Sequence, residues 1–77
     1  MNLTADSIAL FKYLWRDAPD WSGTPLVEVS KEERGNLTQL KRAKLLTTTV
    51  SEGNVFAYFT PAGHAFAATL GLAPLND

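Results

Sequence analysis

Apolar residues recur with a helical period between residues 4 and 18. Their positions, three or four residues apart, are Ile8, Phe11, Leu14, Trp15 and Ala18. Thr4 supplies a hydroxyl for the N-cap, and Asp6 supplies an anion in the first turn, where the helix dipole favours one. Pro19 disfavours helix at the residue before it. The pattern therefore predicts a helix over residues 4–18 with one broad face in the core.

A second helix is predicted over residues 31–44, because Ser30 and Glu33 have the spacing of a capping box. A rotation of about 100° per residue puts Leu37, Leu40 and Lys44 near the core side. The residues that this rotation places on the far side are Lys31, Gly35, Thr38, Gln39 and Arg42. Arg34 and Lys41 flank the apolar stripe. Gly35 costs about 1 kcal/mol relative to alanine in a helix interior. This glycine indicates a close approach to another backbone or a break into two short helices, and we favour one helix.

The segment between these helices, residues 19–30, has two interpretations. Its first part, Trp21 to Pro25, is rich in turn-forming residues. Thr24 and Pro25 can open a short helix, with proline at the first helical position. An extended segment is the alternative, and the sequence leaves both open.

Residues 45–60 predict a β-hairpin. Two runs of β-branched and aromatic residues flank a turn at 51–54 that contains glycine. Strand alternation puts Phe56 and Tyr58 on one face, and Val55, Ala57 and Phe59 on the other.

A last helix is predicted over residues 61–70. Thr60 is its N-cap, Pro61 occupies the first helical position, and Gly71 follows as the C′ residue. The predicted inward stripe is Ala62, Ala65, Phe66, Thr69 and Leu70. We expect the tail to Asp77 to fray.

The amino-acid composition indicates which class of protein this is. With 77 residues, 45% apolar and 19% charged, the chain is expected to form one soluble α+β domain over residues 1–77. It has no cysteine, which excludes disulfides and thiolate zinc sites. No apolar run reaches the roughly 18 residues of a membrane span, and no signal peptide is evident. We expect a cytoplasmic protein without a cofactor.

The charges are unevenly distributed. The net charge is −1, but five of the seven basic residues and two of the eight acidic residues lie in residues 31–44. This segment can present a local positive face on a nearly neutral chain. The alternative is an ordinary solvated helix surface.

Two local strings resemble a winged helix-turn-helix domain, in particular the MarR-like regulators. The run Leu37 to Leu46 is similar to a recognition helix leading into the first wing strand. The run Phe59-Thr60-Pro61-Ala62-Gly63 is similar to the family's L-T-P-A-G-R string, which follows the second wing strand. The resemblance covers roughly residues 4–71 and implies a winged helix that binds DNA.

The chain departs from the family pattern at three places. Lys44 stands where the family usually has glycine, and His64 where it often has arginine. The predicted wing, residues 47–60, has no lysine or arginine and one acid, Glu52.

Sequence-specific binding of double-stranded DNA is the leading functional hypothesis. In a helix-turn-helix the second helix lies in the major groove. Residues that would face bases are Lys31, Thr38, Gln39 and Arg42, with Arg34 and Lys41 on phosphates and Gly35 allowing close approach. A homodimer on a pseudo-palindromic site would be the expected mode.

Protein binding is the alternative function, and it fits the near-neutral charge and the uncharged wing. Trp21 is the candidate interface residue, because tryptophan is enriched at binding hot spots. Its alternative role is in packing. The chain would then be a regulator or inhibitor, encoded by a host or a phage, that binds another protein.

No catalytic or metal site is expected. His64 is the single histidine and has no cysteine partner, and the aspartates have no paired spacing. We therefore predict that the chain is not an enzyme. We also predict that it does not bind membranes, because the polar face of the first helix carries charges of both signs.

Overall fold

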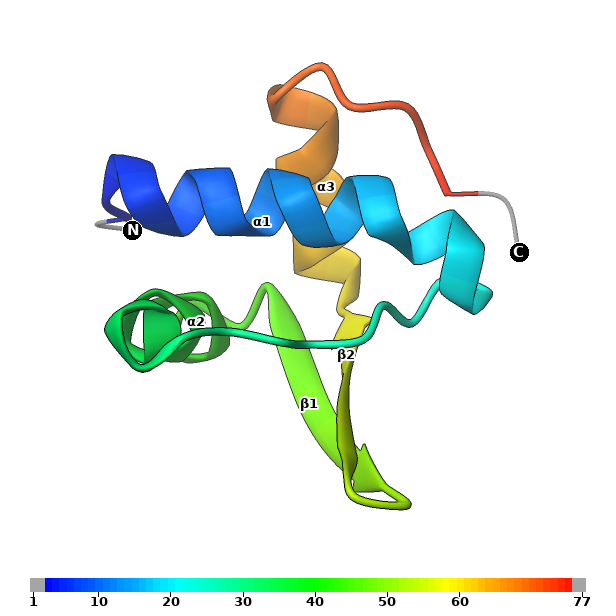
Figure 1. The fold of residues 1–77 in the computed structure, drawn as a ribbon. Coiled ribbons are helices and arrows are strands. Elements are labelled where there is room, and N and C mark those ends of the chain that lie inside the picture. Colours follow the sequence, from blue (N-terminus) through cyan, green and yellow to red (C-terminus); the bar gives the residue numbers. More distant parts are fainter. Residues whose placement is uncertain (1–2, 76–77) are drawn as a thin grey trace.

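The computed structural model describes residues 3–75, and within them the fold is α+β, as predicted (Figure 1). Three α-helices and one two-stranded antiparallel hairpin are joined by two 3₁₀ turns. In chain order the elements are α1 (Ala5–Asp17), η1 (Ala18–Trp21), η2 (Lys31–Glu33), α2 (Arg34–Arg42), β1 (Leu46–Ser51), β2 (Asn54–Phe59) and α3 (Pro61–Thr69). The order and proportions are compatible with a winged-helix-like arrangement.

Helix α1 confirms the sequence prediction closely. The side chain of Thr4 accepts a hydrogen bond from the backbone N–H of Ser7, as an N-cap does. Leu10 and Ser7 are buried in addition to most of the predicted stripe, whereas Ile8 is only half-buried. The buried face of α1 is therefore wider than the apolar pattern alone indicates.

Residues 24–30 are extended, which decides between the two interpretations of this segment. Leu26 forms a β-bridge with Phe56. The Val27 N–H donates to the carbonyl of Val55 at 2.7 Å, and the Ala57 N–H donates to the carbonyl of Pro25 at 3.0 Å. Strand β2 thus lies between β1 and this segment. No helix forms directly before the 31–42 helical stretch.

The hairpin turn lies at the predicted position, and the strands pair up to its two central residues. Ser51 pairs with Asn54, so the turn consists of Glu52 and Gly53 alone. Both residues have positive φ, 53° and 81°, as a type I′ turn requires. Phe56 and Tyr58 share a face, and Ala57 is buried on the other, as predicted.

The second helix begins and ends differently from the prediction. Residues 31–33 form a 3₁₀ turn, and the side chain of Ser30 makes no capping bond, so the predicted capping box is absent. The α-helix ends at Arg42 rather than Lys44. The N–H groups of Lys44 and Leu45 donate to the carbonyls of Lys41 and Leu40. This is a Schellman motif with Lys44 at C′, at a φ of 61°.

The junction between this motif and α3 explains the Thr-Pro-Ala-Gly string. Thr60 caps α3 by accepting from the Gly63 N–H, and its hydroxyl donates to the carbonyl of Lys44. Gly63 lies against the backbone of Leu45, where a Cβ would come within 2.0 Å of the carbonyl oxygen. The string therefore joins the end of α2 to the start of α3.

The predicted inward stripe of α3 is wrong at three of its five positions. Ala62, Ala65 and Thr69 are exposed, whereas Gly63 and Ala67 are buried. The reason is the contact between Gly63 and Leu45, which turns α3 by about one residue relative to the apolar pattern. Gly71, with φ of 75°, occupies the C′ position as predicted.

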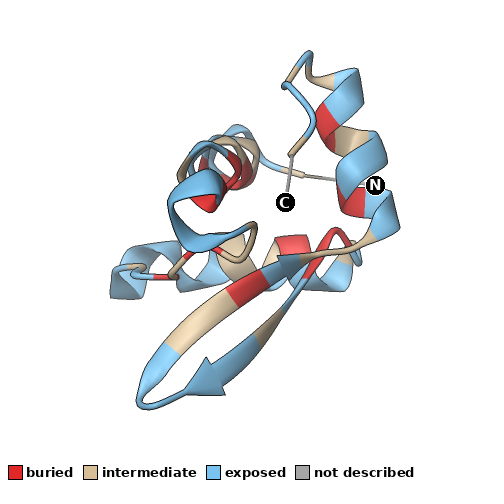
Figure 2. Ribbon diagram, turned by 90° about the vertical axis from the view of Figure 1, so that its right-hand side faces the viewer, coloured by how far each residue is buried: buried red, intermediate tan, exposed pale blue. Residues whose placement is uncertain are grey.

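The core lies where the helices meet the base of the hairpin, and the hairpin tip is exposed (Figure 2). Phe11 is fully buried and packs edge-to-face on Phe59 and Phe66. The described part of the tail contacts α1, because the Trp15 indole N–H donates to the carbonyl of Ala73 at 2.8 Å. The final residues, 76 and 77, lie outside the described part.

Candidate functional site

The exposed face of the second helical stretch carries most of the predicted site residues. Lys31, Gly35, Thr38 and Arg42 are exposed on one stripe, and Arg34 and Lys41 are exposed beside it. The stripe follows the rotation predicted from the sequence, with buried Leu40 on the opposite side. Four cations therefore lie on one solvent-facing surface, hereafter the basic face: Lys31, Arg34, Lys41 and Arg42.

Part of the basic face borders a hollow of about 470 Å³ between α2 and the hairpin. Arg34, Thr38 and Lys41 line its α2 wall, and Thr48 and Val50 line its β1 wall. The hydroxyl of Thr38 donates to the carbonyl of Arg34 at 2.9 Å. Two cations thus line this hollow together with the carboxylate of Glu28, and the β1 wall is uncharged.

Gln39 lies away from the basic face, which corrects the predicted orientation. It is half-buried, and its Oε1 accepts hydrogen bonds from the Ser7 hydroxyl at 2.8 Å and the Thr4 N–H at 3.2 Å. Gln39 is about 60° around the helix from Arg42, and this rotation turns it toward α1. In this position it joins two helices instead of presenting its amide to solvent.

Gly35 satisfies neither structural explanation that the sequence suggested. The helix continues through it, and a Cβ added there would meet nothing within 4 Å. Its exposed position therefore leaves room for an external molecule to approach the helix backbone. Nothing within the described chain requires glycine here.

The wing contributes no positive charge to this surface. Strands β1 and β2 carry no lysine or arginine, and Glu52 is at the tip. A helix-turn-helix has a helix directly before the recognition helix. Here an extended segment and one 3₁₀ turn stand in that place. The basic face thus has neither a helix directly before it nor positive charge from the hairpin beside it.

Trp21, the predicted protein-contact residue, is 41% exposed at the end of η1. Its ring lies beside that of Phe56, with centroids 6.0 Å apart. His64 packs its ring edge-on against Trp15 at 5.1 Å. Neither lies on the basic face, and the histidine has a packing role.

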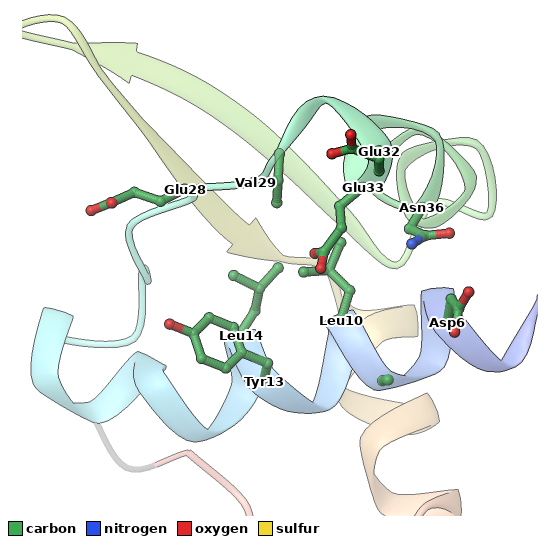
Figure 3. A pocket seen from close by; sticks show the side chains of 10 residues that line it. Asp6, Leu10, Tyr13, Leu14, Glu28, Val29, Glu32, Glu33 and Asn36 are labelled. Atoms are coloured by element: carbon green, nitrogen blue, oxygen red, sulfur yellow. The ribbon is translucent and has the colours of Figure 1, made fainter.

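Sequence reasoning missed a second hollow, of about 550 Å³, between α1 and the start of the second helical stretch (Figure 3). Its floor is apolar, and its lining includes four carboxylates and no lysine or arginine. The carboxylates are those of Asp6, Glu28, Glu32 and Glu33. The sequence signal was the acidic pair before Arg34, which the capping-box interpretation used for helix initiation instead.

Two further observations concern metal binding and membrane-spanning helices. Within residues 3–75, no three histidine, cysteine, aspartate or glutamate side chains are placed to hold a metal ion. In the same part of the chain, every helix is too short or too polar to cross a membrane.

The comparisons with known proteins add no constraint on this arrangement. Neither a protein-family model, nor a curated protein, nor a solved structure matches the chain.

Proposed function

We propose that this protein is a small winged-helix-like regulator that binds double-stranded DNA through the basic face of α2. The observation that carries the proposal is the placement of Lys31, Arg34, Lys41 and Arg42 on one exposed surface of a chain with a net charge of −1. Clustered cations release counterions from the DNA backbone, whatever the total charge of the protein. The chain's positive charge is concentrated where the resemblance to a recognition helix lies.

The individual side chains have distinct roles in this proposal. Lys31 and Arg42 lie on the outermost stripe and are suited to base edges, since arginine and lysine pair with guanine in the major groove. Arg34 and Lys41 flank the stripe and are suited to phosphates. Gly35 lets the helix backbone approach the DNA. Gln39 has no place in this interface, because its carbonyl oxygen already binds α1.

The experiment is a fluorescence-anisotropy titration with a mixed pool of short duplexes at low and physiological salt, followed by selection and sequencing of retained duplexes. We expect affinity to fall steeply with salt. In Lys31→Ala/Arg42→Ala the selected motif is expected to bind at least tenfold more weakly. In Arg34→Ala/Lys41→Ala the salt slope is expected to decrease by about 0.9 for each phosphate that the variant no longer neutralises.

The matched control is Lys12→Ala/Arg16→Ala, which removes two cations from α1 and leaves the basic face intact. Its affinity is expected to change less than twofold at physiological salt. Equal losses in the control and the α2 variants would indicate nonspecific charge attraction. Retention of no duplex at low salt would refute DNA binding.

A further inference from the structure

The hollow between α1 and the second helical stretch is a groove with an apolar floor and an acidic rim, hereafter the acidic groove. Leu10 and Leu14 of α1 are buried and form the floor, with half-buried Val29 above them. Figure 3 shows Val29 and Glu33 pointing from the opposite wall toward α1. An apolar floor between two helical walls can receive the hydrophobic side chains of another helix.

The carboxylates at the rim of the acidic groove indicate a positively charged occupant. Asp6 lies on one wall, Glu32 and Glu33 on the other, and Glu28 at the outer end, and all four are exposed. No lysine or arginine lines the groove to neutralise them. Electrostatic complementarity favours a partner with cations beside its apolar residues, and like charges in that place would be repelled.

Tyr13 adds a third feature at the mouth of this groove. Its side chain is 61% exposed, although it belongs to the same helix as the buried floor. The face of an exposed tyrosine attracts a lysine or arginine side chain through the ring quadrupole. Tyr13 therefore favours a positively charged partner, as the carboxylates do.

The local fold leaves this groove open. Residues 24–30 are extended, so no helix lies between η1 and η2, and Ala9 and Tyr13 of α1 stay exposed beside the buried leucines. A second copy of the described chain offers no suitable occupant either. Five of its seven basic residues lie in residues 31–44, which form one wall of the groove, and the apolar face of that stretch, at Leu40, is buried. The other two, Lys12 and Arg16, lie on α1, whose apolar face is also buried in the core.

From these observations we infer that the acidic groove binds a basic amphipathic helix of a different protein. The partner's leucine-like side chains contact Val29 and Ala9, which line the groove above the buried leucines. Its lysine or arginine side chains contact the carboxylate rim and the ring of Tyr13. This site adjoins the basic face, because Glu28 and Val29 line both hollows and the pair Glu32-Glu33 lies between Lys31 and Arg34.

The test is selection of random 16-residue peptides, displayed on phage, against the immobilised full chain. Selected peptides are then synthesised with a fluorophore and titrated by anisotropy at physiological salt. The expected sequences have lysine or arginine beside leucine, isoleucine or phenylalanine at helical spacing. We expect Glu28→Gln/Glu32→Gln/Glu33→Gln to bind these peptides at least tenfold more weakly than the parent.

Two matched controls separate the groove from general charge attraction. Asp17→Asn/Asp20→Asn/Glu52→Gln removes three carboxylates outside the groove and is expected to bind within twofold of the parent. Tyr13→Ala is expected to weaken binding three- to tenfold, whereas Tyr58→Ala, which removes an exposed hairpin tyrosine, leaves it unchanged. Because Tyr13 is exposed, its variant also tests the groove if the triple variant unfolds.

Three outcomes would overturn the inference. The first is a selection that enriches no sequence, and the second is enrichment of peptides without excess positive charge. The third is equal weakening of peptide binding by the groove variants and their matched controls. DNA binding by the basic face is measured separately and does not depend on any of these results.

Discussion

The Oε1 atom of Gln39 in α2 accepts a hydrogen bond from the hydroxyl of Ser7 in α1, over 2.8 Å. Ser7 is fully buried, and its hydroxyl also lies 3.0 Å from that of Thr4. Two residues 32 positions apart thus join α1 to α2 within a polar cluster that also includes Thr4 and Asn36. This contact holds the Gln39 side chain toward α1 and away from the basic face.

We expect Gln39→Ala to lower the free energy of unfolding by about 1–2 kcal/mol, because the buried Ser7 hydroxyl and the Thr4 N–H lose their shared acceptor. Urea denaturation measured by circular dichroism checks this value. Thr38→Ala, on the exposed face one residue earlier, is the control and should change stability by less than about 0.5 kcal/mol. Equal stability of Gln39→Ala and the parent would show that the contact contributes nothing.

Gly63→Ala is expected to be the most destabilising glycine substitution in the chain. The added Cβ would lie 2.0 Å from the Leu45 carbonyl oxygen, so α3 must move away from the end of α2. Overpacking of this kind costs about 1–3 kcal/mol. Thermal and urea unfolding should both show the loss. A variant as stable as the parent would mean that α3 shifts without cost.

Gly35→Ala is expected to have the opposite effect on stability. Its Cβ meets open space, and alanine is favoured over glycine in a helix interior by about 1 kcal/mol. The variant should therefore raise the urea midpoint. If DNA approaches the helix backbone at this position, the same variant binds DNA more weakly, so stability and affinity change in opposite directions. A gain in both would exclude close approach at Gly35.

Lys44→Gly is expected to stabilise the protein by about 1 kcal/mol, because Lys44 occupies the C′ position of a Schellman motif at a φ of 61°. A side chain is strained in this conformation and glycine is not. Gly71→Ala provides the reciprocal test, because Gly71 has the same role after α3 at a φ of 75°. Chemical denaturation should show a higher free energy of unfolding for Lys44→Gly than for the parent, and a lower one for Gly71→Ala.

Local signals in the sequence were sufficient for the elements whose ends are set by their own residues. Thr4 and Thr60 cap α1 and α3 as their spacing indicates, and Gly71 ends α3. The hairpin followed from β-branched runs around a glycine. These features depend on contacts within a few residues, and such contacts are visible in the sequence.

Features that depend on distant contacts were not predictable in the same way. The extended conformation of residues 24–30 is held by hydrogen bonds to β2, which lies much later in the chain. Gln39 looks like a surface residue on a helical wheel, and its partner Ser7 is a polar residue that apolar periodicity ignores. The acidic groove was not predictable from local signals either, because it forms only where α1, Val29 and the start of the second helical stretch meet.

The second helical stretch is attached to the sheet at both of its ends. Before it, residues 25–27 pair with β2, and after it Leu45 leads directly into β1. These attachments set the position of the basic face relative to the hairpin, whose tip lies at Gly53. A partner that touches both places must present its two contact points at that one spacing. A partner of both surfaces would therefore have to match a length as well as a charge.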